Sequence, residues 1–151
     1  MIRNADIKDL DVLIEIMVEY ANSAPISSLH DPDFDDFRAR KLFMHYITKG
    51  IVLLSEHDDV VTGMLLAGFV EDMWLPEVLQ VREIAWYVKP AYRQSTDGYR
   101  LLKKYESIGR DLIEAGLISD LVITTMEQSP VDISKRGWKK IESNYILEGE
   151  H

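Results

Sequence analysis

The stretch from residue 79 to residue 116 constrains the fold more than any other part of the chain, because it combines a strand, a tight polar turn and a long helix. Residues 79–88 are rich in β-branched and aromatic side chains and end before Pro90, which is typical of a strand. After the turn, apolar side chains at helical spacing predict an amphipathic helix that closes at Gly116. The apolar stripe consists of Leu101, Tyr105, Ile108 and Leu112, and we expect Lys103, Lys104, Glu106, Arg110 and Asp111 on the opposite face.

The start of this helix carries the strongest functional signal in the sequence. A helix begins with unpaired backbone N–H groups and the positive end of its dipole, which together stabilise an anion. Gly98 allows a ligand close to the backbone, and Arg93 supplies a cation suited to phosphate oxygens. Ser95 and Thr96 add hydroxyl groups. These residues favour a pyrophosphate site, but an ordinary helix with a Ser95 or Thr96 cap and a solvated arginine fits the same spacing.

Residues 88–102 (VKPAYRQSTDGYRLL) resemble the acetyl-CoA-binding signature of the GNAT superfamily of N-acetyltransferases, V-x-P-x-x-R/Q-x-x-G-x-G/A-x-x-L. Arg93 matches the Arg/Gln position of the signature, and Gly98 matches its last small residue. Thr96 departs from the pattern, because the family has its middle glycine there. The resemblance implies that acetyl-CoA is the cosubstrate. The residues it assigns to acetyl-CoA binding are Tyr87, Val88, Arg93, Gln94, Ser95, Thr96, Asp97, Gly98 and Tyr99.

The resemblance extends to both ends of the chain. Residues 2–14 (IRNADIKDLDVLI) are similar to the opening strand and helix of the family, and residues 136–145 (RGWKKIESNY) to its closing hairpin. The length of 151 residues predicts a single domain over residues 1–151, and the resemblance implies an α+β fold in α/β/α layers. We expect a mixed, mostly antiparallel sheet of about 6–7 strands with about four helices. The central strands would splay apart to admit the pantetheine arm of acetyl-CoA.

Apolar periodicity and turn residues predict the remaining elements. We expect helices from Asp6 to just before Pro25, over residues 33–49 and over residues 129–135. The further strands are expected at residues 1–4, 51–56, 60–70, 120–126, 138–142 and 144–148. The second and third of these should form an antiparallel hairpin, and the fourth should lie parallel to the strand at 79–88.

Glu83 is the candidate general base, because the resemblance places a glutamate that deprotonates the amine on this strand. Period-two alternation puts Glu83, Ala85 and Tyr87 on one face and Ile84, Trp86 and Val88 on the other. A carboxylate on a central strand must be paired or face a wet cleft. The alternative is therefore a salt bridge from Glu83 to Arg82, Arg100 or Lys103.

The general acid is less well defined. Ile133 and Met126 occupy the positions where the family commonly has a tyrosine and an asparagine, and neither side chain can deliver a proton. Tyr145 is the candidate catalytic acid, with Tyr87 and Ser134 as alternatives. Solvent is a further alternative, because a thiolate with an ordinary thiol pKa needs no strong acid.

Composition restricts the class of partner. The 151 residues carry a formal charge of −9 and no cysteine, which argues against nucleic acid or an anionic membrane and excludes disulfides and thiolate metal sites. The four histidines show no metal-binding spacing, so no metal site is expected. There is no long apolar run and no signal peptide pattern, so we expect a cytoplasmic protein.

Three functions remain to be distinguished. The first is transfer of an acetyl group from acetyl-CoA to a primary amine, on a small molecule, a lysine or a protein N-terminus. The alternative is a catalytically degenerate CoA-binding module with a regulatory or interaction role, which the replacements at Ile133 and Met126 would allow. The third is an acidic decoy protein that binds through charge alone. The sequence leaves the acceptor and the oligomeric state open, with a homodimer among the alternatives.

Overall fold

The computed structural model describes residues 1–30, 33, 35–125 and 132–149. Its centre is a sheet in which the strands follow one another in chain order. Neighbouring strands are antiparallel except for the last pair, which is parallel. The strands are β1 (Ile2–Asn4), β2 (Ile51–His57), β3 (Val60–Glu71), β4 (Leu79–Val88) and β5 (Asp120–Val122).

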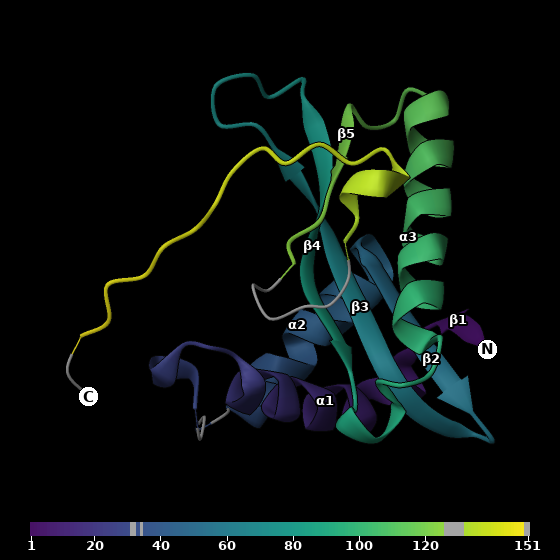
Figure 1. Ribbon diagram of the computed structural model, residues 1–151, viewed down its shortest axis with the longest axis vertical. Coiled ribbons are helices and arrows are strands. Elements are labelled where there is room, and N and C mark those ends of the chain that lie inside the picture. Colours follow the sequence, from purple (N-terminus) through teal and green to yellow (C-terminus); the bar gives the residue numbers. More distant parts are fainter. Residues whose placement is uncertain (31–32, 34, 126–131, 150–151) are drawn as a thin grey trace.

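Three α-helices cover the two faces of the sheet in the described part of the chain. α1 (Leu10–Ser23) and α2 (Asp36–Lys49) lie on one face, and α3 (Asp97–Glu114) runs along the other (Figure 1). Each face has its own apolar cluster, with Leu13 and Phe43 in one and Leu101 and Tyr105 in the other. Burial of these faces is the main stabilising term. The predicted α+β fold with α/β/α layers is confirmed.

Local sequence explains how the first elements begin. Asp6 forms a capping box with Asp9 at the short 3₁₀ turn Ile7–Asp9, and Arg3 makes two hydrogen bonds of 2.8 Å to the Asp9 carboxylate. The β2–β3 hairpin turns at Asp58 and Asp59, whose φ angles of 48° and 63° are those of a type I′ turn. The expected hairpin is therefore present.

The structure differs from the expected elements in its second half. Residues 138–149 form no strand, although two strands were expected there. Strand-forming side chains make a strand only where a neighbouring backbone pairs with them, and this segment extends away from the sheet (Figure 1). The expected helix at 129–135 begins outside the described residues, and its end is the 3₁₀ turn Ser134–Arg136. The described sheet therefore has five strands instead of the expected 6–7.

A β-bulge in β4 overturns the predicted alternation of side chains. Glu83 pairs with Ala67 and Ala85 pairs with Leu66, so Ile84 is an extra residue on β4. Ala85 consequently packs with α1 and α2, whereas Val81 packs with α3. Strict alternation would have put both on one face, so the period-two prediction is wrong across this bulge.

Candidate functional site

The first turn of α3 has open hydrogen-bond donors. The first intrahelical bond joins the Arg100 amide to the Thr96 carbonyl at 2.9 Å. The amides of Thr96, Gly98 and Tyr99 have no hydrogen-bond partner among the residues described. Thr96 occupies the N-cap position but its side chain makes no cap bond. Ser95 caps instead, because its hydroxyl accepts from the Asp97 amide at 3.2 Å. The turn can therefore bind an anion with main-chain donors.

Asp97 contributes to this turn in an unexpected way. Its side chain is fully buried and accepts hydrogen bonds from Thr62 Oγ1 at 2.7 Å and from His57 Nε2 at 3.0 Å. Burial by itself would raise the pKa of Asp97, but the bonds from Thr62 and His57 outweigh it and hold that pKa below its ordinary value. The carboxylate thus faces the protein interior, where it ties the start of α3 to β2 and β3.

Arg93 lies exposed beside the end of β4. Its Nε donates to the Val88 carbonyl at 2.9 Å, and its guanidinium lies 5.2 Å from the centre of the Tyr87 ring. Arg93 therefore lies against both the Val88 backbone and the Tyr87 ring at the end of β4. The guanidinium has five N–H donors, so a single bond to Val88 leaves donors for an incoming anion.

Gly98, Gln94 and Tyr99 surround the same turn. A methyl group at Gly98 would meet Val88 at 3.6 Å and Trp86 at 3.9 Å, which are ordinary contacts. The fold therefore does not require glycine here, and its absent side chain leaves the neighbouring amides accessible. Gln94 is exposed. The Tyr99 ring lies 5.0 Å from the Arg136 guanidinium, and its hydroxyl accepts from Arg136 at 3.2 Å.

Glu83 lies where the β4–β5 ladder ends. The last paired residues are Arg82 and Val122. Beyond them, the Thr124 amide donates to the Glu83 carboxylate at 3.1 Å. Burial raises the pKa of Glu83 to about 7, and the Thr124 bond offsets only part of that effect. No salt bridge involves Glu83 within the described chain, so the alternative of an ion pair with Arg82, Arg100 or Lys103 has no support there.

Among the described residues, none of the candidates for the general acid makes a hydrogen bond to Glu83. Tyr145 is 94% exposed in the C-terminal segment, and no hydrogen bond joins it to β4 in the portion of the chain described. The Ser134 hydroxyl donates to Asp132 at 2.6 Å. Tyr87 is buried next to α1, where its hydroxyl donates to Glu19 at 3.5 Å. Met126 lies outside the described residues.

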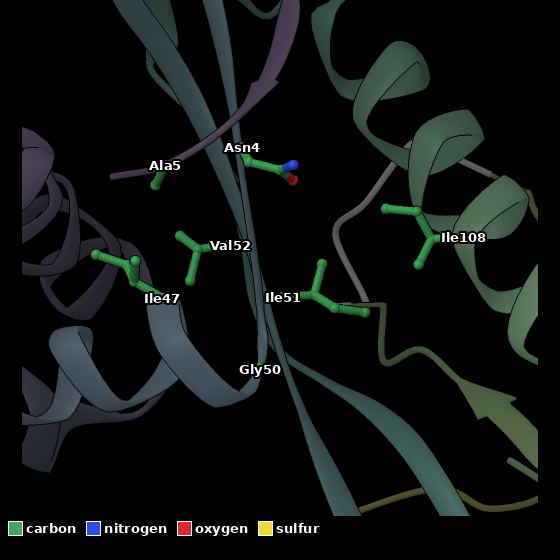
Figure 2. Close-up of a pocket in the computed structure, with 7 residues that line it drawn as sticks. All are labelled: Asn4, Ala5, Ile47, Gly50, Ile51, Val52 and Ile108. Atoms are coloured by element: carbon green, nitrogen blue, oxygen red, sulfur yellow. The ribbon is translucent and has the colours of Figure 1, made fainter. Parts of the chain in front are cut away.

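The described residues line two cavities away from this site. The larger, of about 320 Å³, lies at the β1–β2 edge of the sheet, opposite β5 (Figure 2). Figure 2 shows Ile47 and Val52 on one side of the strands and Ile108 on the other. Its lining contains no titratable side chain, so it holds no acid, base or nucleophile. The other, of about 220 Å³, lies between α3 and the turn at Ser134–Arg136.

Glu106 is a second buried charge in α3, besides Asp97, whose environment the sequence did not indicate. Glu106 was expected on the solvent face but is 7% exposed. It accepts hydrogen bonds from Arg136 Nε at 2.9 Å and from Trp138 Nε1 at 2.7 Å. Its partners lie about thirty positions away in the sequence, so no local pattern indicates them. Arg136 and Trp138 belong to the segment that resembles the family, which was the one available signal.

The fold matches that of known acetyltransferases over nearly the whole chain. A Trypanosoma brucei acetyltransferase matches with a TM-score of 0.71 and 14% identity over 98% of both chains. A predicted acetyltransferase from Clostridium acetobutylicum, solved with acetyl-CoA, has a TM-score of 0.71 and 14% identity over 98% of this chain and 95% of its own. An aminoglycoside acetyltransferase from an uncultured soil metagenomic sample has a TM-score of 0.67 and 11% identity over 99% and 98%.

These matches establish the fold, and the predicted likeness to GNAT acetyltransferases is confirmed at that level. Neither family models nor curated proteins match the sequence. None of the described helices combines the length and the apolar character that a membrane span needs.

Proposed function

We propose that this protein transfers an acetyl group from acetyl-CoA to a primary amine, with Glu83 as the general base. The observation that carries this proposal is the position of Glu83. Its half-buried carboxylate lies at the end of the β4–β5 ladder and has a pKa of about 7, which is suited to a base at neutral pH. The fold shared with acetyltransferases, one of them solved with acetyl-CoA, supports the same reaction.

The start of α3 fits the pyrophosphate of acetyl-CoA. The open amides of Thr96, Gly98 and Tyr99 offer donors, and the exposed Arg93 guanidinium offers charge. The residues that would hold acetyl-CoA are therefore those around this turn. When bound, acetyl-CoA supplies the thioester from which the acetyl group is transferred.

The Glu83 carboxylate performs the proton transfer in this proposal. It accepts a proton from the attacking nitrogen, directly or through a water. The nitrogen forms its bond to the acetyl carbon while the carbon–sulfur bond breaks, and the sulfur leaves as a thiolate. Tyr145, Tyr87, Ser134 or solvent then supplies the proton that the thiolate accepts.

Acetyl-CoA turnover with a panel of primary amines tests the reaction. The wild type should release CoA thiol with at least one amine, and its rate should rise as the pH passes 7 because Glu83 must be ionised. Glu83→Gln should lower kcat/KM by about 10²–10⁴-fold and leave acetyl-CoA affinity nearly unchanged. Glu114→Gln, an exposed glutamate of α3, is the matched control. Equal rates for the wild type and Glu83→Gln would contradict the role of Glu83.

A second candidate function is a CoA-binding module without catalysis. The observations in its favour are Ile133 at the position of the usual tyrosine and the exposure of Tyr145 at 94%. This candidate predicts a stable acetyl-CoA complex that releases no thiol with any amine or protein of the panel. For the first candidate function, the proposed acetyl acceptor is a primary amine on a small molecule, a lysine or a protein N-terminus.

A further inference from the structure

The Tyr105 hydroxyl lies between β4 and β5. Tyr105 is in the middle of α3 and is fully buried. Its hydroxyl is 2.7 Å from the Val122 carbonyl oxygen and 3.4 Å from that of Val81. Val122 belongs to the last paired position of the parallel ladder. A side-chain hydroxyl therefore bridges the two strands at the point where their own hydrogen bonding stops.

The single proton of this hydroxyl has a defined acceptor. The bond to Val122 is shorter by 0.7 Å than the distance to Val81, so the proton is directed at Val122. Burial and the nearby negative charge of Glu83 raise the pKa of Tyr105, so the phenol stays protonated. With its proton on Val122, Tyr105 cannot also donate to the Glu83 carboxylate.

We propose that Tyr105 is a positioning residue for Glu83. Its hydroxyl fixes the Val122 carbonyl, and this places the Thr124 amide, two residues further on, so that it donates to the Glu83 carboxylate. The importance of this positioning for catalysis rests on the proposed function, in which Glu83 is the general base. The geometric link itself does not depend on any activity.

The groups around Glu83 determine how removal of the Tyr105 hydroxyl would change the pKa of Glu83. Tyr20 lies on α1 and Tyr105 on α3, and burial together with the smaller effect of the Glu83 charge raises the pKa of each. Arg82 precedes Glu83 on β4, and its guanidinium lies 3.8 Å from Glu142. Thr124 makes the one hydrogen bond that stabilises the ionised carboxylate among the described residues. If that bond weakens, the pKa of Glu83 must rise further.

Titration of Glu83 by NMR, with ¹³C-labelled glutamate carboxyl groups, tests the proposal. Tyr105→Phe removes the hydroxyl and keeps the ring. It should raise the pKa of Glu83 by about one unit, a tenfold change in proton affinity. Tyr46→Phe is the matched control, because Tyr46 packs with the apolar cluster on the opposite face of the sheet. It should leave the pKa unchanged. An unchanged pKa in a folded Tyr105→Phe protein would overturn the proposal.

A second variant removes the Thr124 donor directly and shows how far the pKa of Glu83 rises when that bond is lost. Thr124→Pro lacks the backbone N–H and lies in an exposed, unpaired segment. It should raise the pKa of Glu83 in the same direction. In the double variant the two changes should not add, since they act on one bond. Full additivity, or a shift in neither single variant, would overturn the proposal.

The NMR readout separates this inference from the proposed function. If no amine is acetylated but both variants shift the pKa of Glu83, the proposed function fails and the positioning role stands. If the enzyme is active, the acid limb of its kcat/KM profile should move to higher pH in Tyr105→Phe along with the pKa of Glu83. An active Tyr105→Phe enzyme with an unmoved profile would contradict the positioning role alone.

Discussion

At the scale of single residues, the position of Glu83 lowers the free energy of unfolding at neutral pH. Burial raises the pKa of Glu83 from 4.5 to about 7. Between these values the folded protein keeps a proton that the unfolded chain has lost. The free energy of unfolding therefore falls as the pH rises from about 4.5 to about 7, and above that the full cost of the partly desolvated charge is present. A general base gains from this arrangement, because a base is most useful when its pKa lies near the working pH.

Glu83→Gln should accordingly stabilise the protein in a pH-dependent way. We expect the free energy of unfolding to increase by about 1–3 kcal/mol at pH 8, with little change at pH 4.5. The glutamine carbonyl can still accept from the Thr124 amide. Urea unfolding at the two pH values measures the difference. A gain of the same size at both values would show that the charge of Glu83 is not the cause.

A substitution at Gly98 should affect acetyl-CoA binding and the stability of the fold in different ways. Gly98→Ala should leave the fold unchanged or stabilise it by about 0.5–1 kcal/mol, because a methyl group meets only ordinary contacts and alanine favours the helix. The same methyl group should weaken acetyl-CoA binding, because it partly covers the open amides. Ser107→Ala, at an exposed position of the same helix, should not affect binding. Unchanged affinity in Gly98→Ala would show that no ligand approaches this backbone closely.

At the scale of elements, the sequence predicts a helix or strand well where the pattern is local. The stripe of Leu101 and Tyr105 predicts α3, and Gly116, with a φ of 71°, follows its end as expected. The bulge at Ile84 was not predicted, because it depends on register with β3. The roles of Tyr105 and Asp97 also escaped prediction, since their hydrogen-bond partners lie on other elements.

Glu106 of α3 accepts hydrogen bonds from two residues of the C-terminal segment, Arg136 and Trp138. We expect Glu106→Gln to weaken this attachment, because it removes the charge that binds Arg136 and leaves a poorer acceptor for Trp138. The loss should be about 1–3 kcal/mol, with faster hydrogen exchange at the Trp138 indole N–H. Glu114→Gln on the same helix should change neither quantity. Unaltered exchange in Glu106→Gln would mean that Trp138 is held by packing instead.

At the scale of the whole molecule, the layered fold was predictable because motifs from three parts of the chain agreed on it. The two C-terminal strands were expected from the resemblance and from residue preferences, but the described segment 132–149 has no partner strand. A homodimer stays a prediction, and sedimentation analysis of the full chain would test it.

The net charge of −9 makes a further prediction for an active enzyme. A cationic amine should be attracted by the field of the whole protein, and salt screens such attraction. Raising the ionic strength from about 20 to about 200 mM should increase KM for a cationic acceptor several-fold and change kcat little. An uncharged amine of similar size is the control. Equal salt dependence for both acceptors would show that the net charge does not assist binding.

The central claim is that the start of α3 binds acetyl-CoA, and calorimetric titration of the purified protein tests it most directly. The account predicts saturable binding to the wild type and affinity at least about tenfold lower in Arg93→Ala, since a charge-assisted contact to phosphate contributes about 1.5–3 kcal/mol. Lys89→Ala, which removes a neighbouring cation paired with Glu15, should bind nearly as the wild type does. Absence of binding at millimolar acetyl-CoA, or equal affinity in the wild type and Arg93→Ala, would contradict the account.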